Sequence, residues 1–156
     1  MKLINDFTSR FHANIILNES LIVKKENRYF LLNENLKSLI AENFFYAGTY
    51  VGKIKSGKFF PSFNLLRIIE ERKANKIIVN NKTAWLFICG RDIFRQGILK
   101  TDGSNRKGDY TLVLNQHQEC LGFGKIVVSL EEEKKGVAIK NISDIGDFLR
   151  RERQQA

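Results

Sequence analysis

The hydrophobic pattern of the first half of the chain predicts helices and short strands in alternation. Apolar residues recur three or four positions apart near the start, which is typical of an amphipathic helix. Shorter apolar runs bounded by polar turn residues predict strands instead. In chain order we expect a helix at 5–16, strands at 21–23 and 29–32, a second helix opened by Asn33, a β-rich stretch at 44–54 and a third helix that begins at Pro61. These elements predict an antiparallel sheet with three helices.

The pattern of the second half centres on the stretch Ala84–Ile98. Its first six residues are apolar and predict a buried strand that ends at Gly90, with Cys89 as a small core residue. A helix of about two turns is expected next, and Gly97 terminates it. Further strands are predicted at 76–79, 110–114, 119–129 and 137–139, and a last helix is capped by Ser143.

The order of these elements predicts an α+β protein of two small domains. We place the boundary near Asn75, with one domain at 1–75 and the other at 76–156. No long linker separates them, so the halves are expected to pack on each other. A chain of 156 residues can bury roughly two-thirds of its unfolded surface, so a substantial core is expected.

Positive charge narrows the classes of partner. The net charge is +9, and a basic protein that contains aromatic residues most often binds nucleic acid. The alternative is a general solubilising charge. Residues 1–80 contain 13 Lys/Arg against 7 Asp/Glu, whereas residues 81–156 contain 13 against 10, so the first half is the more basic.

Two basic clusters are candidates for contact with phosphates. On the last helix, Ile145, Phe148 and Leu149 are expected to face the core, which leaves Arg150, Arg151 and Arg153 outside. Forked arginine donors suit phosphate, while the alternative is favourable pairing with the helix dipole. The other cluster is Lys53, Lys55 and Lys58 around a predicted turn. Its alternative is a charged sheet edge that resists aggregation.

Several chemistries have no support in the sequence. The two cysteines form no C-x-x-C pair, no signal peptide precedes them, and His117-x-x-Cys120 supplies only two possible metal ligands. There is no P-loop and no nucleophile pair, and no apolar run approaches the 18 residues of a membrane span. We therefore expect no catalytic residues, no metal, no cofactor and no membrane contact, and a cytoplasmic location.

Three motifs resemble those of a known domain. They are the Gly90-to-Gly97 corner, the strand Leu121-Gly-Phe-Gly124, and the run Ser143-Asp-Ile-Gly-Asp-Phe-Leu-Arg-Arg151. The glycines of the second motif admit close approach of another backbone or of a nucleotide. Together the motifs are similar to the PUA domain, a small RNA-binding pseudobarrel. The last run resembles the D-I-G-[DE]-[FY]-x-R ending of one PUA-containing family, the Nip-seven ribosome-assembly factors.

The resemblance implies a fold and a function. It implies an N-terminal pre-PUA domain beside a C-terminal PUA β-pseudobarrel in a monomeric, non-catalytic factor for pre-rRNA processing and large-subunit assembly. Its partners would be rRNA precursors, in single-stranded or U-rich segments, together with the pre-ribosomal particle and other assembly factors. The location would be nucleolar in a eukaryote. The implied RNA contacts are Arg150, Arg151 and Arg153, with help from Arg91 and Arg95.

Two other functions stay open at this point. One is an RNA-modifying enzyme, or its accessory subunit, that uses the PUA half for targeting. The other is a protein-docking module of the assembly machinery, with anchors among Phe44, Phe45 and Phe60. Tyr110 is a candidate for base stacking, although we prefer a packing role at the end of its strand.

Overall fold

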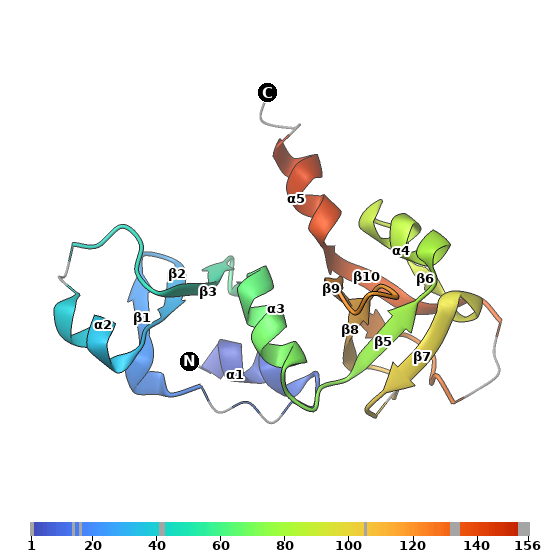
Figure 1. Ribbon diagram of the computed structural model, residues 1–156, viewed down its shortest axis with the longest axis horizontal. Helices are drawn as coiled ribbons and strands as arrows, with labels where there is room; N and C mark the ends of the chain where they lie inside the picture. The colour runs from blue at the N-terminus through green and yellow to red at the C-terminus, as the bar shows by residue number, and fades with distance from the viewer. Residues whose placement is uncertain are drawn as a thin grey trace.

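The computed structural model describes residues 2–13, 15, 17–40, 43–104, 106–131 and 135–152, with the backbone alone at 148–149 and 151–152. Figure 1 shows two sheets side by side along the long axis, with α1 and α3 between them. The protein is therefore an α+β protein that contains a four-stranded and a six-stranded sheet, which confirms the predicted fold class.

The first sheet is antiparallel, in the order β1-β2-β3-β4, and accompanies three helices. The elements of this half are α1 (Lys2–Ser9), a 3₁₀ turn η1 (Glu19–Leu21), β1 (Ile22–Lys25), β2 (Arg28–Leu31), α2 (Glu34–Leu39), β3 (Thr49–Lys55), β4 (Lys58–Pro61) and α3 (Phe63–Glu70). Asn33 caps α2 as predicted, because its Oδ1 accepts a hydrogen bond from the N–H of Leu36 at 2.7 Å. Pro61 is the last residue of β4 rather than the first of α3, which Ser62 caps.

The second sheet has the order β6-β10-β9-β8-β5-β7 and curls into a half-barrel. Its elements are β5 (Lys76–Val79), α4 (Asn81–Ile88), β6 (Ile93–Phe94), a 3₁₀ turn η2 (Arg95–Gly97), β7 (Ile98–Asp102), β8 (Tyr110–Leu114), β9 (Cys120–Ile126), β10 (Val137–Asp144) and α5 (Ile145–Glu152). Strands β5 and β8 run parallel, and the other neighbours run antiparallel.

The predicted central strand is wrong, because its residues form helix α4. Asn80 Oδ1 accepts a hydrogen bond from the N–H of Thr83 at 2.8 Å and so caps a helix. Phe87 faces the core, whereas Trp85 and Leu86 are 64% and 40% exposed. Cys89 lies at the exposed end of this helix and is not a core residue.

The helix predicted between Gly90 and Gly97 is also wrong. The segment contains strand β6, where Ile93 pairs with Ile139 of β10, followed by the short η2 turn. Pairing with β10 stabilises this segment as a strand, whereas an isolated helix of about two turns is only marginally stable. No helix in the part of the chain that the structure describes is long and apolar enough to cross a membrane.

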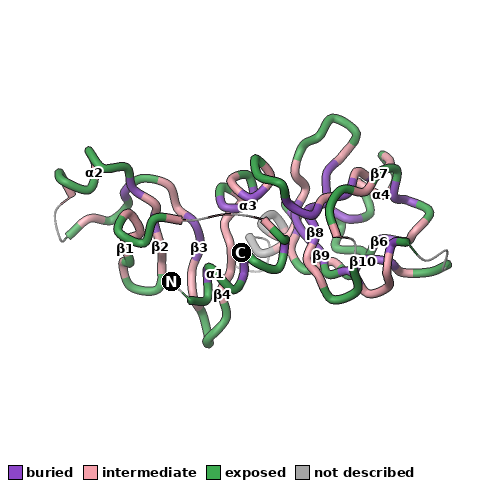
Figure 2. Tube along the Cα trace, turned by 90° about the horizontal axis from the view of Figure 1, so that it is seen from below, coloured by how far each residue is buried: buried purple, intermediate pink, exposed green. Residues whose placement is uncertain are grey.

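One hydrophobic cluster joins the two halves. Phe7 of α1 and Phe11 in the turn after it pack against Phe123 of β9, with ring centroids 5.4 and 5.6 Å from that of Phe123. The same cluster contains Leu65 of α3 and Leu112 of β8. Figure 2 shows buried segments gathered where α3 meets β8 and β9. The predicted packing of the halves is confirmed, while the division at residues 75 and 76 stays a prediction because this core runs across it.

Candidate nucleic-acid interface

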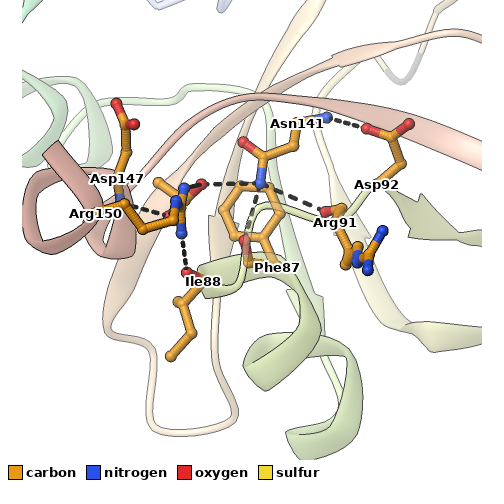
Figure 3. A network of polar contacts seen from close by, with 8 residues as sticks. Phe87, Ile88, Arg91, Asp92, Asn141, Asp147 and Arg150 are labelled. Atoms are coloured by element: carbon orange, nitrogen blue, oxygen red, sulfur yellow. Dashed lines mark hydrogen bonds and ion pairs between the residues drawn. The ribbon is translucent and has the colours of Figure 1, made fainter. Parts of the chain in front are cut away.

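The end of β10 and the start of α5 form a polar corner against α4 (Figure 3). Asp144 is 3% exposed, and its Oδ1 accepts a hydrogen bond from the N–H of Asp147 at 2.9 Å, which caps α5. The Arg150 guanidinium binds the same carboxylate, with Nη2 2.8 Å from Oδ2 and 3.1 Å from Oδ1. Arg150 Nη1 donates to the carbonyl oxygen of Ile88 at 2.6 Å. Arg150 therefore ties α5 to β10 and α4, and a buried carboxylate balances its charge.

The surroundings of this ion pair hold it in place. Asn141 Nδ2 donates to Asp144 Oδ2 at 3.1 Å and to a carbonyl oxygen of α4 at 2.9 Å. A Cβ at Gly146 would lie 1.9 Å from the carbonyl oxygen of Ile88, so α4 and α5 meet closely because residue 146 has no side chain. The Asp144-Ile-Gly146 motif and Arg150 therefore form a clamp for α5. We call this set of residues, with Asn141, the α5 clamp.

The other predicted arginines have different surroundings. Arg91 is exposed beyond the end of α4, and Figure 3 shows it on the other side of Asn141 from Arg150. Arg95 is half-buried, and its Nη2 donates to the carbonyl oxygen of Leu130 at 3.0 Å. The structure thus brings Arg91 and Arg150 to one corner and ties Arg95 to a loop. The side chain of Arg151 and all of Arg153 lie outside the described residues, as do the side chains of Phe148 and Leu149.

Two glycines of β9 bring that strand close to β10. A Cβ at Gly122 would lie 2.1 Å from the carbonyl oxygen of Ser143, and one at Gly124 would lie 2.3 Å from Cγ2 of Ile139. The neighbour that these glycines admit is therefore the backbone and side chains of β10. The sequence motif alone left open whether a strand or a nucleotide approaches there.

The three lysines of the predicted basic cluster lie on the β3–β4 hairpin. Lys53 pairs with Phe60 and Lys55 with Lys58 in the antiparallel register, and partners of this kind project from one face. Lys55 and Lys58 are exposed and Lys53 is half-buried, and no ion pair joins them to another residue of the described ranges. Strand β4 is the edge of its sheet, so the edge-protection interpretation also remains available.

A cleft of 620 Å³ runs beside this hairpin, where α1 and the first sheet face β8, β9 and β10. Arg10, Lys53 and Lys58 line it against a single acidic residue, Asp6, while Lys55 lies outside it. Its volume is within the range of about 300–1,000 Å³ that is usual for ligand sites. The aromatic side chains of its lining are Phe7, Tyr50, Phe59, Phe60, Tyr110 and Phe123.

A second recess of 430 Å³ adjoins the cleft, because Tyr50 and Lys53 line both. Burial raises the pKa of Tyr50, and the nearby charge of Arg28 offsets this only in part. The Tyr50 hydroxyl is therefore protonated at neutral pH. The rest of the recess is lined by Asn27, Arg28, Phe30 and Tyr46. We call the cleft and the recess together the aromatic groove.

Arg10 and Tyr110 close one wall of the aromatic groove. Arg10 Nη1 donates to the Tyr110 hydroxyl at 2.8 Å, and the guanidinium carbon lies 5.0 Å from the ring centroid. The Tyr110 ring also contacts Phe7, Phe11 and Phe123. This confirms the packing role that the sequence favoured for Tyr110.

Sequence reasoning missed the groove as a unit. Its walls come from residues 3–10, 27–30, 46–61 and 110–143, which no local pattern connects. The one signal present in the sequence was the lysine cluster next to an aromatic pair at 59–60. Within the described ranges, no three His, Cys, Asp or Glu side chains gather closely enough to hold a metal ion.

Comparison with known families decides the identity of the second half. A model of the UPF0113 PUA domain matches residues 75–153, half of the chain. The chain belongs to the UPF0113 PUA-domain family. This confirms the PUA domain, an RNA-binding fold, that the glycine motifs predicted. Membership of the narrower Nip-seven family stays a prediction.

Two relatives resemble this chain in sequence. A UPF0113 protein of Archaeoglobus fulgidus is 29% identical over 117 residues, which cover 69% of this chain and 63% of the relative. A tRNA-guanine(15) transglycosylase of Methanosphaera stadtmanae is 27% identical over 129 residues, which cover 81% of this chain and 18% of the relative. The chain thus spans less than two-thirds of the length of either relative.

The fold of both halves recurs in a solved structure of a PUA-domain protein from Thermoplasma acidophilum. The TM-score is 0.59 at 22% identity, and the match covers 97% of this chain and 92% of that one. The arrangement of the four-stranded sheet beside the PUA half-barrel is therefore shared beyond this chain.

Proposed function

We propose that this PUA-domain protein is a non-catalytic RNA-binding factor that acts on precursor rRNA during assembly of the large ribosomal subunit. The observation that carries RNA binding is a PUA domain over residues 75–153 in a chain of net charge +9. The resemblance of Ser143–Arg151 to the ending of the Nip-seven factors supports precursor rRNA as the ligand. The proposed partners are the pre-ribosomal particle and its other assembly factors.

On the PUA half, the proposed phosphate contacts are the arginines around the α5 clamp. Arg91 is exposed at this corner, and Arg95, Arg151 and Arg153 are proposed to assist it. Arg150 holds α5 in place through three hydrogen bonds to Asp144 and Ile88, so its direct contact with phosphate stays a prediction. On single-stranded RNA, each neutralised phosphate adds roughly −0.7 to the slope of the logarithm of the binding constant against the logarithm of the salt concentration, which we call the salt slope.

Ultraviolet crosslinking of the tagged full chain in its own cells, followed by sequencing of the bound RNA, tests this proposal. We expect precursor-rRNA reads to be enriched over tRNA reads, and the protein to sediment with pre-ribosomal particles. Recovery of no RNA, or sedimentation only as free protein, would contradict the ribosomal role. Nucleoside analysis of rRNA and tRNA incubated with the protein is expected to show no base modification beyond that of the same RNA incubated without it.

A second candidate function is a targeting module of an RNA-modifying enzyme. The observation that favours it is the 129-residue similarity to a segment of a tRNA-guanine(15) transglycosylase. In that case the crosslinked RNA would be tRNA, and a partner enzyme would accompany the protein through purification. The same crosslinking experiment therefore separates the two candidates.

A further inference from the structure

We propose that the aromatic groove is a second RNA site, which binds an unpaired segment by stacking bases on its rings and holding phosphates with its lysines. This inference rests on the proposed RNA-binding function and adds a surface that lies mostly outside residues 75–153. Single-stranded nucleic acids are bound in this way elsewhere, on aromatic platforms interleaved with cations.

Phe60 provides the clearest stacking platform. It is half-buried in the lining of the cleft, and no aromatic ring of the described residues stacks on it. Its neighbour Phe59 differs, because the Phe59 ring packs 5.4 Å from that of Phe7 in the shared core. Tyr50 is the second platform, since it lines both parts of the groove and remains half-buried.

The charges beside these rings are placed to hold a backbone. Lys53 is the cross-strand partner of Phe60, and Lys58 lies two residues before Phe60 on the same strand. Neither lysine has an ion pair within the described ranges, so both are available to phosphates. Arg10 at one end and Arg28 in the recess extend the positive lining.

The geometry favours unpaired RNA over a duplex. The cleft of 620 Å³ and the recess of 430 Å³ share two lining residues, so they can receive successive bases rather than a whole helix. A duplex keeps its base faces stacked inside and presents only base edges, riboses and phosphates, whereas unpaired bases offer their π-faces to aromatic side chains.

Fluorescence anisotropy of the full chain with a labelled U-rich single strand, and with a hairpin duplex of equal length, tests the groove. Phe60→Ala is expected to weaken single-strand binding roughly 5- to 100-fold, the range found for loss of one stacked base, and Phe60→Tyr to retain it. Changing Lys53 and Lys58 together to Ala is expected to weaken binding and to reduce the salt slope by up to about 0.7 per lysine.

Lys55→Ala is the matched control, because Lys55 lies on the same hairpin face but outside the lining of the groove. It is expected to change single-strand affinity less than twofold. Circular dichroism and urea unfolding of each variant check that the fold is kept. Wild type is expected to prefer the single strand to the hairpin duplex.

Three results would overturn the inference. If wild type binds RNA and the groove variants bind equally well, RNA lies elsewhere, and the proposed function survives alone. If Lys55→Ala weakens RNA binding as much as the change of Lys53 and Lys58 does, the β3–β4 hairpin attracts RNA only through its general positive charge. If wild type binds no RNA and the groove instead takes an acidic peptide in the same assay, both the groove inference and the proposed function fail.

Discussion

The α5 clamp and the aromatic groove both contain cations, but they differ in what balances the charge. In the clamp, Arg150 lies against the buried carboxylate of Asp144 and donates to a backbone carbonyl. In the groove, Lys53 and Lys58 have no anionic partner within the described ranges. The densest run of arginines in the second half therefore includes a residue with a structural role. The charges of Lys53 and Lys58 are instead available to bind a ligand.

Charge density along a sequence therefore does not measure the charge available to RNA. A guanidinium hydrogen-bonded to a buried carboxylate forms a nearly neutral unit, and separating it would leave that carboxylate uncompensated. An exposed lysine has no such constraint. Four predictions test this contrast between the clamp and the groove, in order of decreasing effect.

The largest effect is expected for Arg150→Ala on stability. This change leaves the Asp144 carboxylate, whose side chain is 2% exposed, without its counter-charge. Because the Arg150 side chain is 42% exposed, we expect the free energy of unfolding to fall by about 2–3 kcal/mol. This is below the loss of roughly 3–5 kcal/mol that is found when a fully buried ion pair is broken. Urea unfolding of Arg150→Ala, Asp144→Ala and the double variant measures the coupling. Strictly additive costs would show that the two residues do not act as a unit.

A smaller loss of stability is expected for Gly146→Ala. The added Cβ would lie 1.9 Å from the carbonyl oxygen of Ile88, so α4 and α5 must separate. We expect this to lower the free energy of unfolding by about 2 kcal/mol. Gly108→Ala is the control, because Gly108 has a positive φ of 100° and open space around it. There we expect about 1 kcal/mol from backbone strain alone. A harmless Gly146→Ala in urea unfolding would mean that the close approach is not needed.

The third prediction compares RNA affinities at a temperature where every variant is folded. Changing Lys53 and Lys58 together is expected to weaken single-strand binding by roughly fivefold or more at low salt, because two unpaired cations are lost. Arg150→Ala is expected to weaken binding less than the double lysine change, since the Arg150 guanidinium is already hydrogen-bonded within the protein. Anisotropy titrations give both numbers. A larger effect of Arg150→Ala would reverse the comparison and support the C-terminal helix as the phosphate contact.

The fourth prediction concerns the two cysteines, of which Cys89 lies at the end of α4 and Cys120 packs against the shared core. Burial raises the pKa of the Cys120 thiol to about 11, so only about one molecule in a thousand carries the thiolate there at pH 8. Cys89 is exposed at the end of α4 and is expected to react first with iodoacetamide. Labelling of Cys120 should rise by up to about two orders of magnitude between pH 8 and pH 10, because the reactive species is the thiolate.

Peptide mass spectrometry of the alkylated protein measures both rates. If bound RNA covers the end of α4, it is expected to slow the labelling of Cys89. If RNA occupies the aromatic groove alone, the labelling rate of Cys89 is expected to stay the same. Rapid labelling of Cys120 at pH 8 would contradict its burial against the shared core.

Local signals predicted much of the fold. Asn33 caps α2 as predicted, and Asn80 caps α4 in the same way, although the residues after Asn80 were predicted to form a strand. The two asparagines differ in the residues that come after them. After Asn80, the run from Ala84 to Cys89 is apolar throughout, and such a run does not distinguish a strand from a helix. Tertiary placement decided it, by burying Phe87 and leaving Trp85 in solvent.

The site was less predictable, because its parts meet only in three dimensions. Asp144 and Arg150 are six residues apart, which is not a helical neighbour spacing, and their contact depends on the turn from β10 into α5. The three lysines lie on one hairpin, as the predicted turn implies, and their contact with RNA stays a prediction. The opposite wall of the groove comes from α1 and from β8 to β10, so the groove itself required the fold.

The salt dependence of RNA binding by the wild-type chain tests the distinction between available and balanced charge. We predict that affinity for a U-rich single strand falls linearly on a log–log plot, with a slope of roughly −0.7 for each phosphate contacted. A slope that becomes shallower when Lys53 and Lys58 are changed, and stays the same when Arg150 is changed, would support the distinction. Absence of binding at low salt, or binding that does not depend on salt, would contradict it.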